Sequence, residues 1–176
     1  MINIYTERFL QKHPKIITEI IFRWYPIKFE DLENLVPKLD QKTFDLLCQN
    51  PNLCCNKRFL LEFKDRINWD ITSQQNCESW TFEFLKEFKD DLVWFLISAN
   101  ESINWDSINF LSFSKELHIS YLCSNPSFPW SIAAIEHFMS YSDFNWTELS
   151  SNPGSFWTSD LIEQFANNLI WYKLSE

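Results

Sequence analysis

Glycine is almost absent from this sequence, with one residue, Gly154, among 176. Sheet-rich proteins need glycine in tight turns and bulges, so its scarcity favours helices. It also argues against the glycine-rich loops that cradle phosphates in nucleotide-binding enzymes. Aromatic residues, in contrast, make up 18% of the chain and hydrophobic residues 45%, which is ample for a packed core.

Long apolar runs are missing as well. No stretch approaches the roughly 18 uncharged apolar residues of a membrane span. The N-terminal residues include Glu7 and Arg8 and do not have the apolar run of a secretory signal. We therefore expect a cytoplasmic protein with no membrane partner.

The five cysteines are odd in number and contain no CxxC pair. In a reduced compartment we expect them to be small buried hydrophobic residues. A metal site formed by Cys54, Cys55 and a histidine is the alternative, but adjacent cysteines rarely point at one ion. We expect no metal ion and no other cofactor.

A repeat of 25 residues covers most of the chain. Trp94 starts WFLISAN and Trp146 starts WTELSSN, and both fit the pattern W-x-x-[LI]-S-x-N. Four other copies vary the pattern, with Cys48 and Cys123 replacing the serine in two of them. The first residues of the copies, called anchors here, are Phe44, Trp69, Trp94, Ile119, Trp146 and Trp171.

Two further markers keep register with the first five anchors. Eleven residues after them lie Cys55, Trp80, Trp105, Trp130 and Trp157. Nineteen residues after them lie Phe63, Phe88, Phe113, Phe138 and Phe165. Most of the nine tryptophans therefore occupy markers, and we interpret them as core between repeats rather than as a stacking platform for bases or sugars.

Each copy is predicted to form two short helices. The first begins after the second marker, where every residue is of an N-cap type: Asn56, Thr81, Asp106, Ser131 and Thr158. The second carries the anchor, and we expect caps four residues before it: Asp40, Asp65, Asp90, Ser142 and Asn167, with Ser114 in the fourth copy. Asn100, Asn125 and Asn152 are expected to close the turn that follows, as asparagine does where glycine is missing.

The sequence thus predicts an all-α fold, a short α-solenoid of about five two-helix repeats within a single compact domain. Neither helix is long enough to be stable alone, so stability must come from stacking of the repeats. Residues 39–176 form the repeat array. Residues 1–38 form an N-terminal helical cap, in which Trp24 and the apolar residues from Ile16 to Phe22 are expected to pack on the first repeat.

The WxxLSxNxxxxWS-type unit resembles a family of tryptophan-rich tandem repeats found in proteins of bacteria and their mobile elements. The resemblance covers about residues 39–176. As a short, acidic, free-standing array, the chain is also similar in style to small inhibitors of bacterial conflict systems. Immunity proteins and anti-CRISPR proteins, including an inhibitor of an RNA-guided RNase, are examples. This similarity does not assign a functional role to any residue of the chain.

Negative charge is concentrated in the later part of the chain. Residues 1–66 contain 11 Lys or Arg and 9 Asp or Glu, whereas residues 67–176 contain 4 and 15. One interpretation is solubility, and the other is an acidic face that meets a basic protein. The candidate residues of that face are Glu78, Glu83, Glu87, Asp90, Asp91, Glu101, Glu136, Asp143, Glu148 and Glu163.

These features predict a non-enzymatic protein-binding solenoid, best interpreted as an acidic inhibitor of a nucleic-acid-processing enzyme. No HExxH motif or nucleophile elbow is present, and His13, His118 and His137 occupy unrelated repeat positions, so we assign no catalytic residue. Direct nucleic-acid binding is disfavoured because it needs cations that face phosphates. The alternatives are a scaffold that oligomerises through its ends, or a hydrolase with a carboxylate pair that the fold would create.

Overall fold

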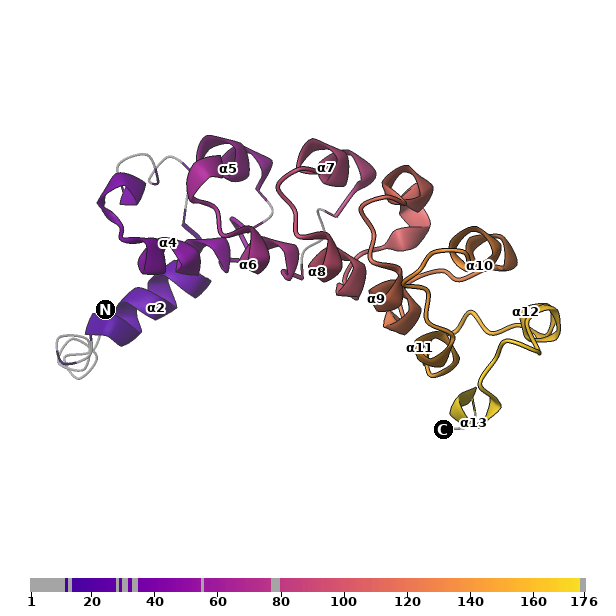
Figure 1. The fold of residues 1–176 in the computed structure, drawn as a ribbon. Helices are drawn as coiled ribbons and strands as arrows, with labels where there is room; N and C mark the ends of the chain where they lie inside the picture. The colour runs from indigo at the N-terminus through magenta and orange to yellow at the C-terminus, as the bar shows by residue number, and fades with distance from the viewer. Residues whose placement is uncertain are drawn as a thin grey trace. The chain divides into compact units, whose positions relative to one another are not determined.

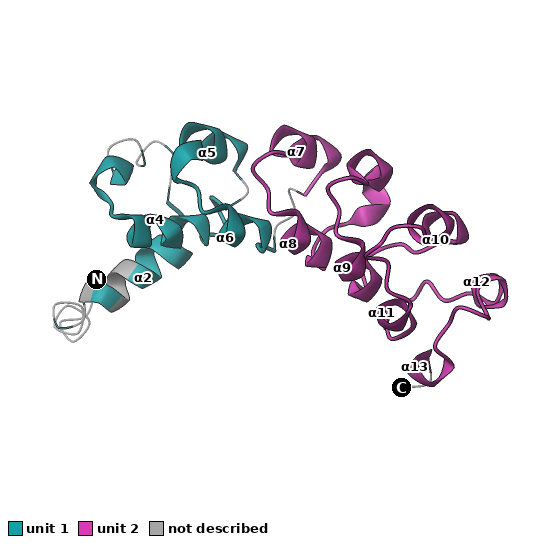
Figure 2. Cartoon of the chain, in the orientation of Figure 1, with its two compact units in different colours: residues 1–79 teal, residues 80–176 magenta. Residues whose placement is uncertain are grey.

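The computed structural model describes residues 14–27, 35–54, 56–76 and 80–174, together with residues 12, 29 and 32. Every regular element among these residues is a helix, so the all-α prediction is confirmed for the described part of the chain (Figure 1). The chain divides into two compact units, residues 1–79 and residues 80–176 (Figure 2). The predicted division into residues 1–38 and 39–176 stays a prediction.

Unit 1 is built from short helices. Its α-helices are α2 (Pro14–Trp24), α4 (Gln41–Cys48), α5 (Lys57–Glu62) and α6 (Trp69–Ser73). Its 3-10 helices are η1 (Val36–Lys38) and η2 (Lys64–Arg66). Helix α4 packs against both α2 and α6.

Unit 2 continues with the same kind of element. Its α-helices are α7 (Phe82–Glu87), α8 (Trp94–Ala99), α9 (Ile119–Ser124), α10 (Ile132–Phe138), α11 (Trp146–Ser150), α12 (Ser159–Gln164) and α13 (Trp171–Leu174). Its 3-10 helices are η3 (Trp105–Ser107) and η4 (Phe110–Phe113).

Two kinds of helix alternate along the chain. Those that carry an anchor residue, here called anchor helices, are α4, α6, α8, α9, α11 and α13, and the intervening helices are α5, α7, α10 and α12. In unit 2 the anchor helices pack in sequence, α8 on α9, α9 on α11 and α11 on α13. The intervening helices of this unit lie along one side of that row (Figure 2).

Four of the five predicted caps of the intervening helices are confirmed. Thr81 and Thr158 each accept a hydrogen bond from the backbone N–H three residues later, at 3.2 Å. Asn56 and Ser131 cap α5 and α10 in the same way. Each cap satisfies an amide that the first turn of a helix leaves free.

The fifth cap, Asp106, is a wrong prediction, because the third copy has η3 and η4 in place of one α-helix. Fifteen residues after the anchor, where other copies have an apolar residue, lies the exposed Asn109. Ile108 is buried instead, one position earlier, with 4% of its surface exposed. This shift breaks the helical stripe, and tight turns such as that from Trp105 O to Ile108 N, at 3.1 Å, replace the α-helix.

The caps predicted four residues before each anchor hold in the first copy alone, where Asp40 accepts from the Thr43 N–H at 2.8 Å. In later copies the helix begins at the anchor itself, so Asp65, Asp90, Ser114, Ser142 and Asn167 are not its N-cap residues. The cause is the turn after the phenylalanine marker, which bonds back onto that marker, as Leu92 N does to Phe88 O at 3.0 Å. The turn takes up the residues that were expected to be helical.

The second and third markers supply the core of unit 2. Trp80, Trp105 and Trp130 are buried, as are the phenylalanine markers Phe88, Phe113, Phe138 and Phe165. The anchors differ, since Trp94 and Trp146 are half-buried and each packs on the phenylalanine marker of its own copy. Trp171 is followed by no such marker and is 56% exposed, so its assignment to the core is wrong.

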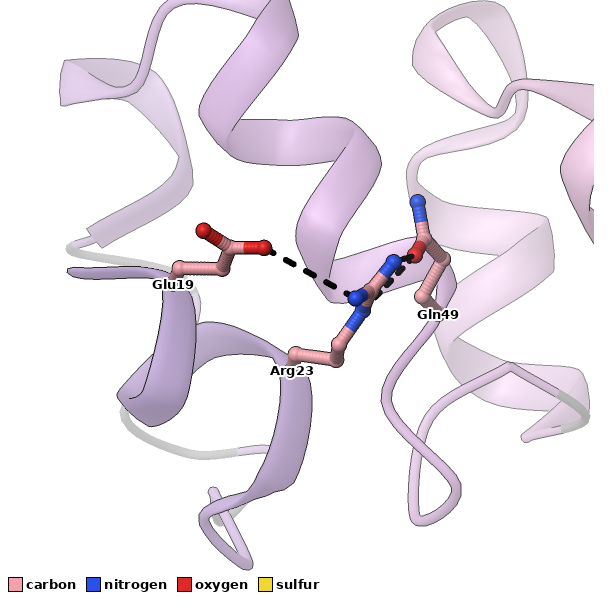
Figure 3. A network of polar contacts seen from close by, with 3 residues as sticks. All are labelled: Glu19, Arg23 and Gln49. Atoms are coloured by element: carbon pink, nitrogen blue, oxygen red, sulfur yellow. Dashed lines mark hydrogen bonds and ion pairs between the residues drawn. The ribbon is translucent and has the colours of Figure 1, made fainter. Parts of the chain in front are cut away.

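Helix α2 is attached to α4 by polar contacts rather than by Trp24. Arg23 lies between Glu19, at 3.7 Å, and Gln49, whose Oε1 accepts from Arg23 Nε at 2.8 Å (Figure 3). These contacts leave Trp24 64% exposed, and Ile20 and Ile21 are exposed too. The prediction that these three residues pack on the first repeat is therefore wrong, and Ile16 and Ile17 lie outside the described side chains.

The single glycine is required by a close approach of the chain to itself. A Cβ atom at Gly154 would lie 2.8 Å from the ring of Phe156 and 2.9 Å from the carbonyl oxygen of Pro126. Both distances are shorter than a carbon atom tolerates. Gly154 thus lets the turn after α11 pass close to the turn after α9.

Candidate functional site

Buried asparagines connect successive anchor helices. In unit 2, Asn125 Nδ2 donates to the carbonyl oxygens of Ser98 and Asn100, at 2.9 and 3.3 Å. Asn152 Nδ2 donates to those of Cys123 and Asn125, at 2.7 and 3.0 Å. Both side chains are at least 96% buried, so each bond satisfies a carbonyl at a helix end that water does not reach.

The same asparagines also shape their own turns. Asn125 Oδ1 accepts from Ser127 N at 2.9 Å, and Asn152 Oδ1 accepts from Gly154 N at 2.8 Å. The predicted turn-closing role is therefore confirmed. The backbone does not use the left-handed conformation that replaces glycine, because no described residue has a positive φ. The bonds between repeats were not predicted.

In unit 1, Asn50 makes equivalent bonds to α2. Its Nδ2 donates to the carbonyl oxygens of Phe22, at 3.0 Å, and Tyr25, at 2.8 Å. Tyr25 precedes Asn50 by 25 residues, the same interval that separates Asn100 from Asn125. The end of α2 thus bonds like the end of an anchor helix, although its sequence does not fit the repeat.

The serine of the repeat pattern is a second connection between anchor helices. Ser98 Oγ accepts from the backbone N–H of His118 at 3.0 Å, and Ser150 Oγ accepts from that of Ile170 at 3.0 Å. Ser98 also donates back to Trp94 O at 2.8 Å. The hydroxyl therefore satisfies an amide at the start of the next anchor helix.

The cysteines that replace this serine occupy the same position. The backbone N–H of Asn68 bonds to Cys48, and that of Asn145 bonds to Cys123. Burial raises the pKa of both thiols to about 11, so both stay protonated at neutral pH. Cys48, Cys54 and Cys123 are buried thiols, which confirms the expected role of these three, while Cys55 and Cys77 lie outside the described residues.

The predicted acidic residues are distributed over several elements. Glu78 lies outside the described residues, and the other nine belong to unit 2. On the intervening helices lie Glu83 and Glu87 (α7), Glu136 (α10) and Glu163 (α12). Glu148 belongs to α11, and the turns contain Asp90, Asp91, Glu101 and Asp143. Asp91 and Asp143 are half-buried, and the other seven are exposed.

One member of this set has a structural role. Asp143 Oδ2 accepts a hydrogen bond from the backbone N–H of Ile119 at 2.8 Å. Its carboxylate thereby satisfies a free amide at the start of α9 and lies near the positive end of the helix dipole. Asp143 is thus a less suitable partner-binding residue than the exposed glutamates.

Lysine offsets little of the negative charge of unit 2. Lys89 Nζ lies 2.5 Å from Glu116 Oε1, and the hydrogen bond with this carboxylate raises the pKa of Lys89. Residues 80–176 contain 4 Lys or Arg and 13 Asp or Glu, a net charge of −9. Residues 1–79 contain 11 of each, so the net charge of the chain comes from unit 2.

Three rings to which the sequence analysis gave no binding role form a cluster on α8 and at the start of α9. The ring centroids are separated by 5.8 Å for Phe95 and Tyr121, 6.1 Å for Phe95 and His118, and 6.2 Å for His118 and Tyr121. His118 is exposed, and Phe95 and Tyr121 are 38% and 43% exposed. The available signal was an aromatic residue at the variable x positions of the repeat pattern. At the first of these, that of Phe95, other copies have Asp70 or Thr147.

A cleft of about 370 Å³ lies at the end of unit 2, where Trp157, Trp171 and Lys173 contribute to its lining. None of the predicted acidic residues lines it in the described part of the chain.

Among the described side chains, no group of three or more His, Cys, Asp or Glu is placed to hold a metal ion. None of the described helices is long and apolar enough to cross a bilayer.

Comparisons with protein-family models, with curated proteins and with solved structures give no match for this chain.

Proposed function

We propose that this chain is a non-enzymatic helical-repeat protein whose acidic unit 2 binds a basic surface on another protein. The target that suits this charge is the nucleic-acid-binding groove of an enzyme, which the protein would inhibit by occupying it. The role is that of a small inhibitor, such as an anti-CRISPR or immunity protein. We further propose that the repeats form one short α-solenoid.

The observation that carries this proposal is the separation of charge between the units. Unit 1 has no net charge, whereas unit 2 has a net charge of −9 over 97 residues, from 80 to 176. Solubility would be served equally well by charge spread along the chain. Negative charge concentrated in one unit would steer it toward a cationic groove and speed their association.

The repeat connections support the solenoid part of the proposal. Hydrogen bonds from Asn125 and Asn152 and to Ser98 and Ser150 recur from one anchor helix to the next. Stacked repeats of this kind build extended surfaces whose exposed residues vary without loss of the core. Such a surface suits recognition of one long groove.

An affinity experiment tests the function. The full chain is immobilised and exposed to cell lysate at low salt, and bound proteins are eluted either with high salt or with double-stranded nucleic acid. We expect nucleic-acid-binding enzymes to be retained and to be released by both treatments, because salt screens the charges and nucleic acid competes for the groove. Retention of nothing at low salt, or retention that nucleic acid does not reverse, contradicts the proposal.

A matched pair of variants tests which unit supplies the negative charge that binding needs. In the first, Glu83, Glu87, Glu136 and Glu163 of unit 2 are changed to glutamine. In the control, Glu19, Glu62, Asp65 and Asp70 of unit 1 are changed to their amides, which removes the same number of charges. We expect the first variant to lose the retained enzymes and the control to keep them. Equal losses would assign the effect to overall charge.

A second candidate function is a scaffold that oligomerises through its ends. Large apolar side chains are exposed on α2, where Trp24 and Tyr25 are 64% and 62% exposed, and on α13, where Trp171 and Tyr172 are 56% and 65% exposed. Light scattering over a range of concentrations tests this alternative. A monomer at high concentration argues against it.

A further inference from the structure

The ring cluster of Phe95, His118 and Tyr121 lies partly exposed where α8 packs on α9. None of the three residues is a marker. The position of Phe95 is polar in most other copies, as at Asp70 and Thr147, whereas the position of Tyr121 is apolar in three others. The three rings contact one another, and part of the surface of Phe95 and Tyr121 remains open to solvent. Aromatic groups gathered on an exposed surface are typical of interaction sites.

The backbone beneath the cluster is fixed by connections between repeats. The His118 N–H donates to Ser98 Oγ at 3.0 Å, and the Ile119 N–H donates to Asp143 Oδ2 at 2.8 Å. The N-terminal end of α9 is therefore held by the preceding copy and by the turn before α11. Because this backbone is already ordered, a ligand that binds these rings would lose little free energy by ordering it.

The surroundings of the cluster favour a cation. Aromatic faces attract cations, and a surface with net charge −9 repels phosphates. Glu148 of α11 occupies the same position in its helix as Tyr121 in α9, two residues after the anchor, and α9 packs on α11. The axes of packed helices lie about 8–10 Å apart, so the exposed Glu148 is within the span of an arginine side chain that stacks on Tyr121.

Arginine suits this combination better than lysine does. A guanidinium is planar, so it can stack on an aromatic ring while the N–H groups at its edge bond to a carboxylate. A lysine ammonium is a compact, strongly hydrated charge without such a face. Basic grooves that bind nucleic acid are rich in arginine, so the occupant agrees with the proposed partner.

We infer that Phe95, His118 and Tyr121, with Glu148 beside them, form an anchor site for an arginine side chain of the protein partner. The inference rests on the proposed function and deepens it, because it names the residues that meet the basic surface and the partner side chain that they receive. The site differs from the predicted acidic face, since it combines stacking with a single carboxylate.

Two labelled peptides of equal charge test the site with the full chain. One contains three arginines separated by glycine and serine, and the other contains three lysines in the same places. Affinity is measured by fluorescence anisotropy at about 0.15 M salt, where exposed charges are screened beyond roughly 8 Å. We expect tighter binding of the arginine peptide. Tyr121→Ala and Phe95→Ala are expected to weaken that binding by about 2- to 5-fold, the range of a cation–π contact at an exposed site.

The controls separate the anchor from general effects. Tyr121→Phe keeps the ring and is expected to bind as the wild type does, and Glu148→Gln is expected to weaken binding. Met139→Ala removes another exposed hydrophobic side chain of unit 2, at 45% exposure, and Glu62→Gln removes a charge from α5 of unit 1. Neither variant is expected to change the affinity. Thermal unfolding of each variant shows whether it remains folded.

Several outcomes would overturn the anchor site. They are no binding of the arginine peptide, equal affinity for the two peptides, an unchanged affinity in Tyr121→Ala, or displacement of the peptide by a neutral oligosaccharide. The proposed function is judged separately, by release of retained enzymes with nucleic acid. If that release is observed while the Phe95 and Tyr121 variants retain the enzymes like the wild type, the partner uses another face.

Discussion

The side-chain amide of Asn152 donates a hydrogen bond of 2.7 Å to the backbone carbonyl oxygen of Cys123, 29 residues earlier in the chain. This bond joins the turn after one anchor helix to the end of the preceding helix. Asn125 bonds to Ser98 in the same way at 2.9 Å. The asparagine of the repeat pattern therefore holds neighbouring copies together, in addition to closing its own turn.

Replacing Asn152 should destabilise the protein strongly. Asn152→Ala leaves two carbonyl oxygens and the Gly154 N–H without their partner in a buried place, and we expect a loss of about 2–4 kcal/mol in the free energy of unfolding. Asn152→Asp has the same shape but places a carboxylate against the two carbonyls, so its loss should be larger. Urea denaturation measures both variants. Asn109→Asp, at an exposed position, is the control and should change little.

The serine and cysteine of the repeat pattern should be interchangeable. Ser98→Ala leaves the His118 N–H without an acceptor, and we expect a cost of about 1–3 kcal/mol. Ser98→Cys should cost less, because Cys123 contacts the Asn145 N–H from the same position. Denaturation of the two variants, with Ser124→Ala at an exposed site as the control, gives the comparison. Equal losses for alanine and cysteine would contradict the acceptor role.

The buried thiols should make stability depend on alkaline pH. Burial raises the pKa of Cys48 and Cys123 from 9.0 to about 11. The unfolded chain loses these protons at lower pH than the folded chain, so the stabilisation is complete below pH 9 and is lost as the pH rises through about 11. A shift of this size corresponds to about 3 kcal/mol for each thiol.

The double variant Cys48→Ser, Cys123→Ser tests this dependence. Serine does not titrate in this range and already occupies the same position in other copies. The free energy of unfolding of the wild type should fall more steeply between pH 9 and 11 than that of the double variant. Parallel curves would show that other groups cause the decrease.

Trp105 and Trp130 should respond differently to phenylalanine. Trp130 Nε1 donates to Leu122 O at 3.2 Å, whereas Trp105 Nε1 is buried without a hydrogen-bond partner. Trp130→Phe therefore loses a bond, and Trp105→Phe removes an unsatisfied donor and should cost less. Trp105→Ala should cost about 3–5 kcal/mol, because the ring is 1% exposed and its removal leaves a cavity. Thermal or urea unfolding ranks the three variants.

Much of the helical pattern was predictable because it depends on local chemistry. Thr81 and Thr158 cap their helices as their position after a marker indicated. Anchor-helix starts were harder to predict, because Asp90 is a good cap type and yet lies in the turn that bonds back to Phe88. Whether Asp90 caps the helix or lies in the turn depends on how the turn packs. The spacing of residues in the sequence does not show that packing.

The candidate binding residues were less predictable. Net charge identified the acidic residues of unit 2, and it did not show that Asp143 is used by the Ile119 N–H. Phe95 and Tyr121 lie 26 residues apart, one residue more than the repeat, so their contact depends on how α8 packs on α9. The sequence of a repeat helix does not show whether an aromatic side chain at such a position is exposed or buried.

The interval between the last complete copies, 27 residues instead of 25, shows how such an array can change its length. Asn152 bonds to Cys123 and Asn125 as Asn125 bonds to Ser98 and Asn100, so the two extra residues do not alter the connection. They are accommodated in the turn between α10 and α11. Because a copy with this asparagine brings both its donor and its acceptors, gene duplication or deletion can lengthen or shorten the protein by such copies while the joints between them stay the same.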